Sequence, residues 1–205
     1  VPTLLFAALY ARRAWTLGRE GRPVAIWRLW LFALGIAVAL LGFMSPLHAI
    51  GEEQSMAVHM SQHLIFGDIV PLLILFGLTR QLLRPLLALP VLGELRVLAH
   101  PLVALPLWAL NMYLWHLPGA YDAALGNDLI HAIQHICFLA TGAFMWAALL
   151  ETLPGPRWFG TGAKIGFLVV VRTLGTILGN IFTWSAGGFY HHYDDVPRLF
   201  GLSQA

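Results

Sequence analysis

The sequence predicts an all-α protein, a polytopic transmembrane helical bundle with five full spans and an N-terminal partial span. Of its 205 residues, 59% are hydrophobic and only 11% are charged, whereas about a quarter of the residues in a soluble domain are charged. So few charged side chains cannot cover a solid apolar core, and lipid must therefore solvate much of the surface. The apolar residues also gather in runs of about 20, the length of helix that crosses the hydrocarbon layer.

Five of these runs are expected to be full spans, and a shorter run comes before them. Residues 1–11 form the remainder of an earlier span, and the full spans are residues 25–47, 55–78, 98–117, 129–150 and 163–186. No internal repeat or long linker divides the chain, so residues 1–205 form a single transmembrane helical domain. Because the chain begins inside an apolar run and finishes without an end signal, we expect it to be truncated at both ends.

Local signals support the ends of these spans. Ser55 precedes the second span, and Asn127 or Asp128 precedes the fourth. Each can cap the first turn by accepting a hydrogen bond from a backbone N–H group. Pro101 suits the first turn of the third span, whereas Pro106 should kink that span because a proline inside a helix removes a backbone hydrogen bond.

The charged residues of the connecting segments predict the orientation in the membrane. The segments before the first, third and fifth full spans are basic, with Arg12, Arg13, Arg19, Arg22, Arg80, Arg84, Arg96, Arg157 and Lys164. The alternate segments carry acidic residues: Glu52, Glu53, Asp122, Asp128, Asp194 and Asp195. The positive-inside rule therefore places the Arg-rich loops in the cytoplasm. The net charge of +2 is small, and no nucleic-acid partner is expected.

With this orientation, histidines gather near the extracytoplasmic face. Two pairs share one spacing, His59 with His63 at the start of the second span and His131 with His135 at the start of the fourth. Residues four apart differ by about 40° around a helix and about 6 Å along it, so their imidazoles can reach one ion. Both spans run inward, which places the two pairs at similar depth. Other histidines expected near this face are His48, His116, His191 and His192, whereas His100 is at the inner face.

We therefore predict that the two histidine pairs bind one metal ion, since histidine within a span indicates function. Imidazole suits copper, zinc and iron, while thioether favours copper(I). Met56 and Met60 each lie three residues before a histidine and can share its helix face, which favours copper over zinc or iron. His116 is a further candidate ligand. In the alternative interpretation, the histidines hydrogen-bond loops or lipid headgroups, and the methionines fill space between helices.

Two other features complete the prediction. Neither histidine pair has the glutamate that a zincin protease needs after its first histidine. Asp68 and Arg172 are both expected near the middle of the membrane, where an unpaired charge is costly, and we predict that they pair. This ion pair is interpreted as structural, fixing the register of two helices, in preference to a proton path.

Several motifs follow one another along most of the chain: Ser45-Pro46-Leu47; His59-Met-Ser-Gln-His63 with Pro71; Trp115-His116-Leu-Pro118 with Tyr121-Asp122; His131-Ala-Ile-Gln-His135; and Tyr193 with Pro197-Arg198-Leu-Phe-Gly201-Leu-Ser203. In this order they resemble the CtaG-type cytochrome c oxidase assembly factor family. The resemblance implies a multi-pass bacterial plasma-membrane protein that is needed for active haem–copper oxidase and is thought to handle copper. His59, His63, His131 and His135 stand at the matching metal positions.

This sequence departs from the usual family pattern in two places. Asp68 stands where an apolar residue is expected, and the family normally continues with another span after Ser203. The first departure leaves room for a specialised paralogue. The second leaves the number of helices open.

The sequence as a whole predicts a membrane assembly factor for haem–copper cytochrome c oxidase. It would hold copper at the outward-facing four-histidine site and transfer it without catalysis, in the plasma (inner) membrane of a bacterium. Its expected partners are an oxidase subunit or its copper donor, and the lipid bilayer. One alternative is a membrane metalloenzyme, oxygenase- or hydrolase-like, that uses the same histidines with Asp122 or Asp128 as base. Another is a structural subunit of a respiratory complex, with zinc or no metal.

Overall fold

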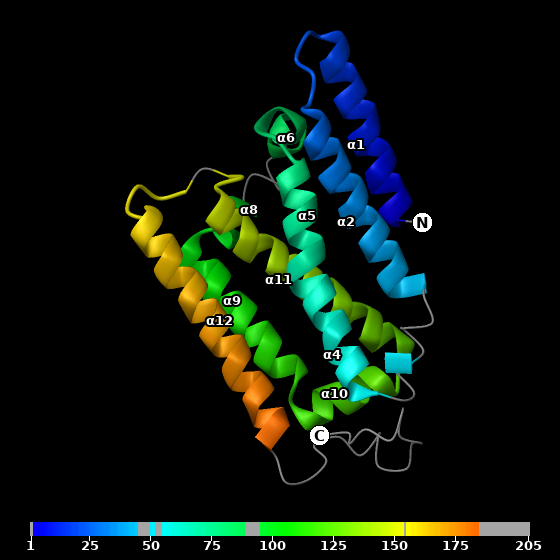
Figure 1. Ribbon diagram of the computed structural model, residues 1–205, viewed down its shortest axis with the longest axis vertical. Helices are drawn as coiled ribbons and strands as arrows, with labels where there is room; N and C mark the ends of the chain where they lie inside the picture. Colours follow the sequence, from blue (N-terminus) through cyan, green and yellow to red (C-terminus); the bar gives the residue numbers. More distant parts are fainter. Residues whose placement is uncertain (1, 45–49, 52–54, 89–94, 154, 185–205) are drawn as a thin grey trace.

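The structure is a computed structural model that describes residues 2–44, 50–51, 55–88, 95–153 and 155–184, and regular structure within these ranges is entirely helical. The helices form an elongated bundle (Figure 1). In chain order they are α1 (Pro2–Arg19), α2 (Ile26–Met44), α4 (Met56–Leu64), η1 (Ile65–Ile69), α5 (Val70–Gly77), α6 (Arg80–Leu87), α8 (Leu95–Leu98), α9 (Pro101–Trp115), α10 (Pro118–Leu125), α11 (Asp128–Leu150) and α12 (Thr161–Trp184).

The centre of the bundle is made by two long helices. One is α4–η1–α5, a continuous helix whose middle turn, η1, is π-helical. The other is α11, which packs against η1, α5 and α9. Figure 1 shows α1 and α2 along one edge of the bundle and α12 along the other, with α10 crossing below α4. The central pair therefore carries the structural core and both histidine pairs.

Among the described residues, four helices are long and apolar enough to cross a membrane: α2, α4–η1–α5, α11 and α12. They match the spans expected at 25–47, 55–78, 129–150 and 163–186. The span expected at 98–117 forms α9, an apolar helix that is shorter, with 15 residues. The structure thus confirms an all-helical chain with several candidate spans. It does not confirm the exact number of five full spans plus a partial one.

The N-terminal helix is longer than the sequence predicts. α1 continues beyond residue 11 as far as Arg19, so that Arg12 and Arg13 lie on a helix and not in a loop. Tyr10 anchors α1: its ring stacks on Phe32 of α2 with centroids 3.6 Å apart, and its hydroxyl donates a hydrogen bond to the Gly77 carbonyl oxygen at 3.0 Å. This contact ties the outermost helix to the central one.

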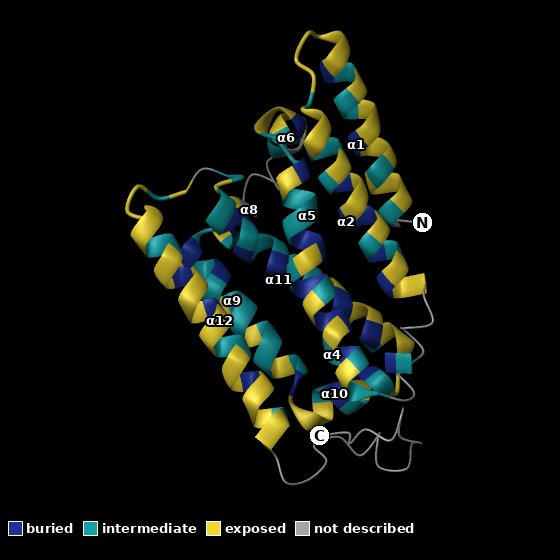
Figure 2. Cartoon of the chain, viewed as in Figure 1, coloured by how far each residue is buried: buried dark blue, intermediate teal, exposed yellow. Residues whose placement is uncertain are grey.

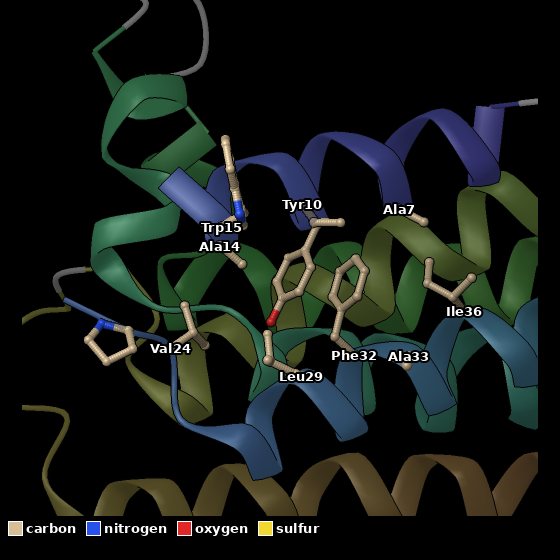
Figure 3. A pocket seen from close by; sticks show the side chains of 11 residues that line it. Ala7, Tyr10, Ala14, Trp15, Val24, Leu29, Phe32, Ala33 and Ile36 are labelled. Carbon is tan, nitrogen blue, oxygen red and sulfur yellow. The ribbon is translucent and has the colours of Figure 1, made fainter. Parts of the chain in front are cut away.

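A pocket of about 600 Å³ lies between α1 and α2. Figure 3 shows Tyr10 and Phe32 side by side in it, with small side chains such as Ala7 and Ala33 along its walls. None of the described residues that line this pocket is a histidine. It is an apolar gap left where small residues face one another across two helices, and it is separate from the histidine site.

The predicted helix starts are confirmed. The Ser55 hydroxyl accepts a hydrogen bond from the Val58 N–H at the start of α4, and the Asn127 side chain accepts from the N–H groups of Leu129 and Ile130 at the start of α11. Pro101 occupies the first turn of α9, as expected. Because these caps satisfy backbone donors that a helix leaves unpaired, they define where each histidine-bearing helix begins.

The two central helices approach each other very closely at a pair of glycines. A Cβ atom at Gly142 of α11 would lie 2.8 Å from the carbonyl carbon of Gly67 in η1 and closer still to its oxygen. Only a residue without a side chain allows two backbones to come this near. Figure 2 shows the buried residues concentrated along α11 and α4–η1–α5, while α12 is largely exposed, as expected of a surface that lipid would cover.

Candidate functional site

The first histidine pair lies on α4 and the second on α11, one turn or so from the capped start of each helix. His59 and His63 follow the Ser55 cap, and His131 and His135 follow the Asn127 cap. All four imidazoles are at most 5% exposed. Burial of four titratable rings in an apolar bundle is costly unless other groups compensate for the lost solvation, so this cluster is the candidate functional site.

The four imidazoles form one cluster. Within each pair the ring centroids are 4.4 Å apart, both for His59–His63 and for His131–His135. Between the helices, His59 lies 5.2 Å from His131 and 6.3 Å from His135, and His63 lies 5.7 Å from His135. The sequence prediction that both pairs enter the bundle at the same end and at similar depth is therefore confirmed.

The type of ligand and the distances between the rings both suit a metal ion. Four imidazoles that bind one ion with nitrogen–metal bonds of about 2.0–2.1 Å hold their ring centroids roughly 5 Å apart, which is within the observed 4.4–6.3 Å. In the described ranges, however, no group of three or more His, Cys, Asp or Glu side chains is disposed to hold a metal ion as it stands.

Aromatic rings enclose the cluster on several sides. Tyr121 of α10 is fully buried and lies edge-on to His59, with centroids 5.1 Å apart. Phe66 of η1 lies edge-on to His135 at 4.8 Å, and Phe138 of α11 stacks on His63 at 4.4 Å. These rings separate the imidazoles from the surroundings and limit the rotamers that each can adopt.

His116, predicted as a further ligand, lies at the edge of the cluster, where it is the C-cap residue of α9. Its Nε2 is 3.4 Å from Nδ1 of His63 and 3.2 Å from the sulfur of Met60. Met60 and Met56 both pack against Tyr121. The structure thus brings His116 and Met60 beside the cluster, while Met56 contacts its aromatic wall.

Of the remaining histidines, His100 is the one within the described residues. His100 caps the other end of α9, 16 residues from His116 and thus about 24 Å away along the helix, as expected of a histidine at the opposite end of the span. His48, His191 and His192 lie outside the described residues.

Comparison with known proteins identifies the chain's family. Residues 8–200 match the family described as cytochrome c oxidase caa3 assembly factor. The chain belongs to this assembly factor family. The resemblance read from the sequence motifs is therefore confirmed, and the motifs that carry it include both histidine pairs.

The similar curated proteins extend beyond this chain. Uncharacterized proteins of Mycobacterium bovis and of Mycobacterium tuberculosis are each 25% identical to it over 217 residues, which cover 96% of this chain and 32% of the relative. The chain thus spans about a third of the length of the curated relatives that it matches. No solved structure matches it.

In this assembly factor family member, the predicted pairing of Asp68 with Arg172 is also confirmed. The Asp68 carboxylate accepts hydrogen bonds from both terminal guanidinium nitrogens of Arg172, at 2.5 and 3.3 Å. The indole N–H of Trp146 donates to the same carboxylate at 2.7 Å, a contact that the sequence did not predict. Asp68 belongs to η1, Trp146 to α11 and Arg172 to α12, so one carboxylate links three helices.

Two buried glutamines were missed by sequence reasoning. Gln62 and Gln134 precede the second histidine of each pair and are at most 2% exposed. The Gln62 amide donates to the Gly42 carbonyl oxygen at 3.2 Å, whereas neither amide atom of Gln134 has a hydrogen-bond partner among the described residues. The sequence contains a signal for these glutamines, because both motifs have the pattern His-x-x-Gln-His. A repeated polar residue inside an apolar span indicates a constraint beyond the two histidines.

Proposed function

We propose that this chain supports assembly of haem–copper cytochrome c oxidase by holding copper at the cluster of His59, His63, His131 and His135 and passing it on. The family supplies the assembly role. The observation that carries the metal proposal is the convergence of four buried imidazoles from two helices. Imidazole nitrogens in a protected site are a donor set for copper, zinc or iron.

The surroundings of the cluster favour copper over zinc or iron. The Met60 sulfur lies beside the cluster, 3.2 Å from His116, and Met56 packs on the same wall. Thioether sulfur is a soft ligand that suits copper(I). Neutral imidazole and thioether ligands also release an ion more readily than thiolates, which suits delivery of a metal cargo.

The site is proposed to face the extracytoplasmic side of a bacterial plasma membrane. Basic residues lie at the opposite ends of the candidate spans, for example Arg80 and Arg84 after α5 and Lys164 in the first turn of α12. By the positive-inside rule, these ends are cytoplasmic and the histidine ends are external. The proposed partners at that face are an oxidase subunit that receives copper and a donor that supplies it.

Metal analysis of purified variants tests the proposal. Copper(I) is titrated into detergent-solubilised wild type and into His59→Asn and His131→Asn. His100→Asn is the matched control, because asparagine retains the N-cap role of His100 at a histidine outside the cluster. The wild type and the control are expected to bind copper, and the two cluster variants to lose binding while retaining their helical circular dichroism. Copper binding that is unchanged in both cluster variants would contradict the proposal.

The same variants test the biological role. In a strain that lacks this protein, the wild-type chain and His100→Asn should restore active oxidase, whereas His59→Asn and His131→Asn should not. Normal oxidase activity in the deletion strain, together with copper binding by the wild type, would favour a metalloenzyme or a structural subunit instead.

A further inference from the structure

A hydrogen bond between a side chain and the backbone lies at the C-terminal end of α9. Nδ1 of His116 lies 2.6 Å from the carbonyl oxygen of Met112. A carbonyl oxygen can only accept a hydrogen bond, so Nδ1 must carry the proton and donate it. The bond lies within a well-anchored segment of α9. The Asn111 amide donates to the Thr141 hydroxyl of α11 at 3.2 Å, and the Tyr113 hydroxyl donates to the Leu174 carbonyl oxygen of α12 at 3.0 Å.

The second nitrogen of His116 then acts as an acceptor. His116 is only 9% exposed, and a doubly protonated ring there would place a positive charge where solvation is poor. The neutral ring with its proton on Nδ1 leaves a lone pair on Nε2. Two groups approach this lone pair, the sulfur of Met60 at 3.2 Å and Nδ1 of His63 at 3.4 Å. A thioether has no proton to donate, so of these two only His63 can supply one.

The proton position on His63 follows. If Nδ1 of His63 donates to His116, the neutral ring of His63 carries its lone pair on Nε2. This Nε2 atom is buried and has no hydrogen-bond partner among the residues that the structure describes. His63 itself lies in contact with the rings of His59 and His135. A metal ligand needs such a lone pair that no hydrogen bond occupies.

We propose that His116 is a positioning residue that holds His63 in the tautomer with its proton on Nδ1, through the relay Met112 carbonyl–His116–His63. Nε2 of His63 is thereby left as the atom that binds metal. This role differs from that of an added ligand, which the sequence suggested for His116. The metal-binding consequence depends on the proposed function, whereas the relay itself does not. Partners of this kind, which orient a ligating histidine, typically change metal affinity by about 10–100-fold when they are removed.

Nitrogen-15 NMR of histidine-labelled, metal-free protein in detergent micelles tests the relay directly. In the wild type, His63 should show a protonated Nδ1 and an unprotonated Nε2. His116→Gln should keep this pattern, because its amide oxygen can accept from Nδ1 of His63, whereas His116→Leu should lose it. A proton on Nε2 of His63 in the wild type would overturn the proposal without any variant. An unchanged tautomer in a folded His116→Leu protein would overturn it too.

Copper(I) titration of the same proteins tests the consequence. Affinity should fall about 10–100-fold in His116→Leu and much less in His116→Gln. X-ray absorption of the copper-loaded proteins should give the same number of nitrogen ligands in wild type and His116→Gln. One fewer nitrogen ligand in His116→Gln would show that His116 itself binds copper, and this would overturn the proposal. If the wild type binds no copper but His63 shows the expected tautomer, the proposed function fails and the relay stands.

Discussion

Replacement of Gly142 by alanine should separate the two central helices and thereby disrupt the histidine cluster. The added Cβ would meet the Gly67 carbonyl carbon at 2.8 Å, and its oxygen closer still. Ordinary contact begins at 3.4 Å, so η1 and α11 must move apart by at least about 0.6 Å. Because the obstacle is backbone and not a side chain that can rotate, we expect a loss of about 3 kcal/mol, the upper end of overpacking costs.

The matched control is Gly175→Ala on α12, where an added Cβ has no atom within 4 Å. Alanine is favoured over glycine inside a helix by about 1 kcal/mol, so this variant should be neutral or slightly more stable. Both variants are unfolded in mixed micelles while tryptophan fluorescence is followed, and copper(I) affinity is measured at the same time. Gly142→Ala should lose stability and affinity together. Equal stability of the two variants would refute the inferred close approach of η1 and α11.

Two further predictions concern the ion pair and the helix cap. In a double-mutant cycle, Asp68→Asn and Arg172→Gln should show a coupling energy of about 1–3 kcal/mol in the free energy of unfolding, because removing one partner leaves the other charge unpaired within the span. Additive effects would mean that the contact contributes nothing. Asn127→Ala should lower the free energy of unfolding by about 1 kcal/mol, since two N–H groups lose their acceptor. Asn127→Asp should restore most of that loss, and no difference between alanine and aspartate would contradict the capping role.

Much of the site could be predicted from the sequence because its determinants are local. The four-residue spacing in His59–His63 and His131–His135 places each pair on one helix face, and Ser55 and Asn127 define where these helices begin. The alternation of basic and acidic loops gives both helices the same direction. Given equal direction and equal distance from the helix start, the two pairs lie at the same depth when the two helices begin at the same level, and the ring distances in the structure agree with this.

The parts that could not be predicted depend on contacts between residues far apart in the chain. The π-helical turn at η1 inserts an extra residue into the α4–α5 helix, and it lies where the backbone of Gly67 meets Gly142. The hydrophobic pattern of the sequence does not reveal such a turn. The extra residue changes the rotation between His63 and Asp68 around the helix, but the residues around them stay apolar. The contact of Trp146 with Asp68 likewise depends on the angle at which α11 crosses η1.

Sequence patterns by themselves thus determined the all-helical class, the assembly factor family, the histidine pairs and the pairing of Asp68 with Arg172. The family follows from the resemblance of its ordered motifs, whereas the other three depend on composition, helical spacing or the cost of a lone charge in lipid. The tertiary structure decided which nitrogens of His63 and His116 meet which neighbours. His116 lies 53 residues from His63 in sequence, and the packing of both α9 and the α4–η1–α5 helix against α11 brings their rings together. Proton positions follow from such contacts, because a tautomer is set by the partner that a nitrogen meets.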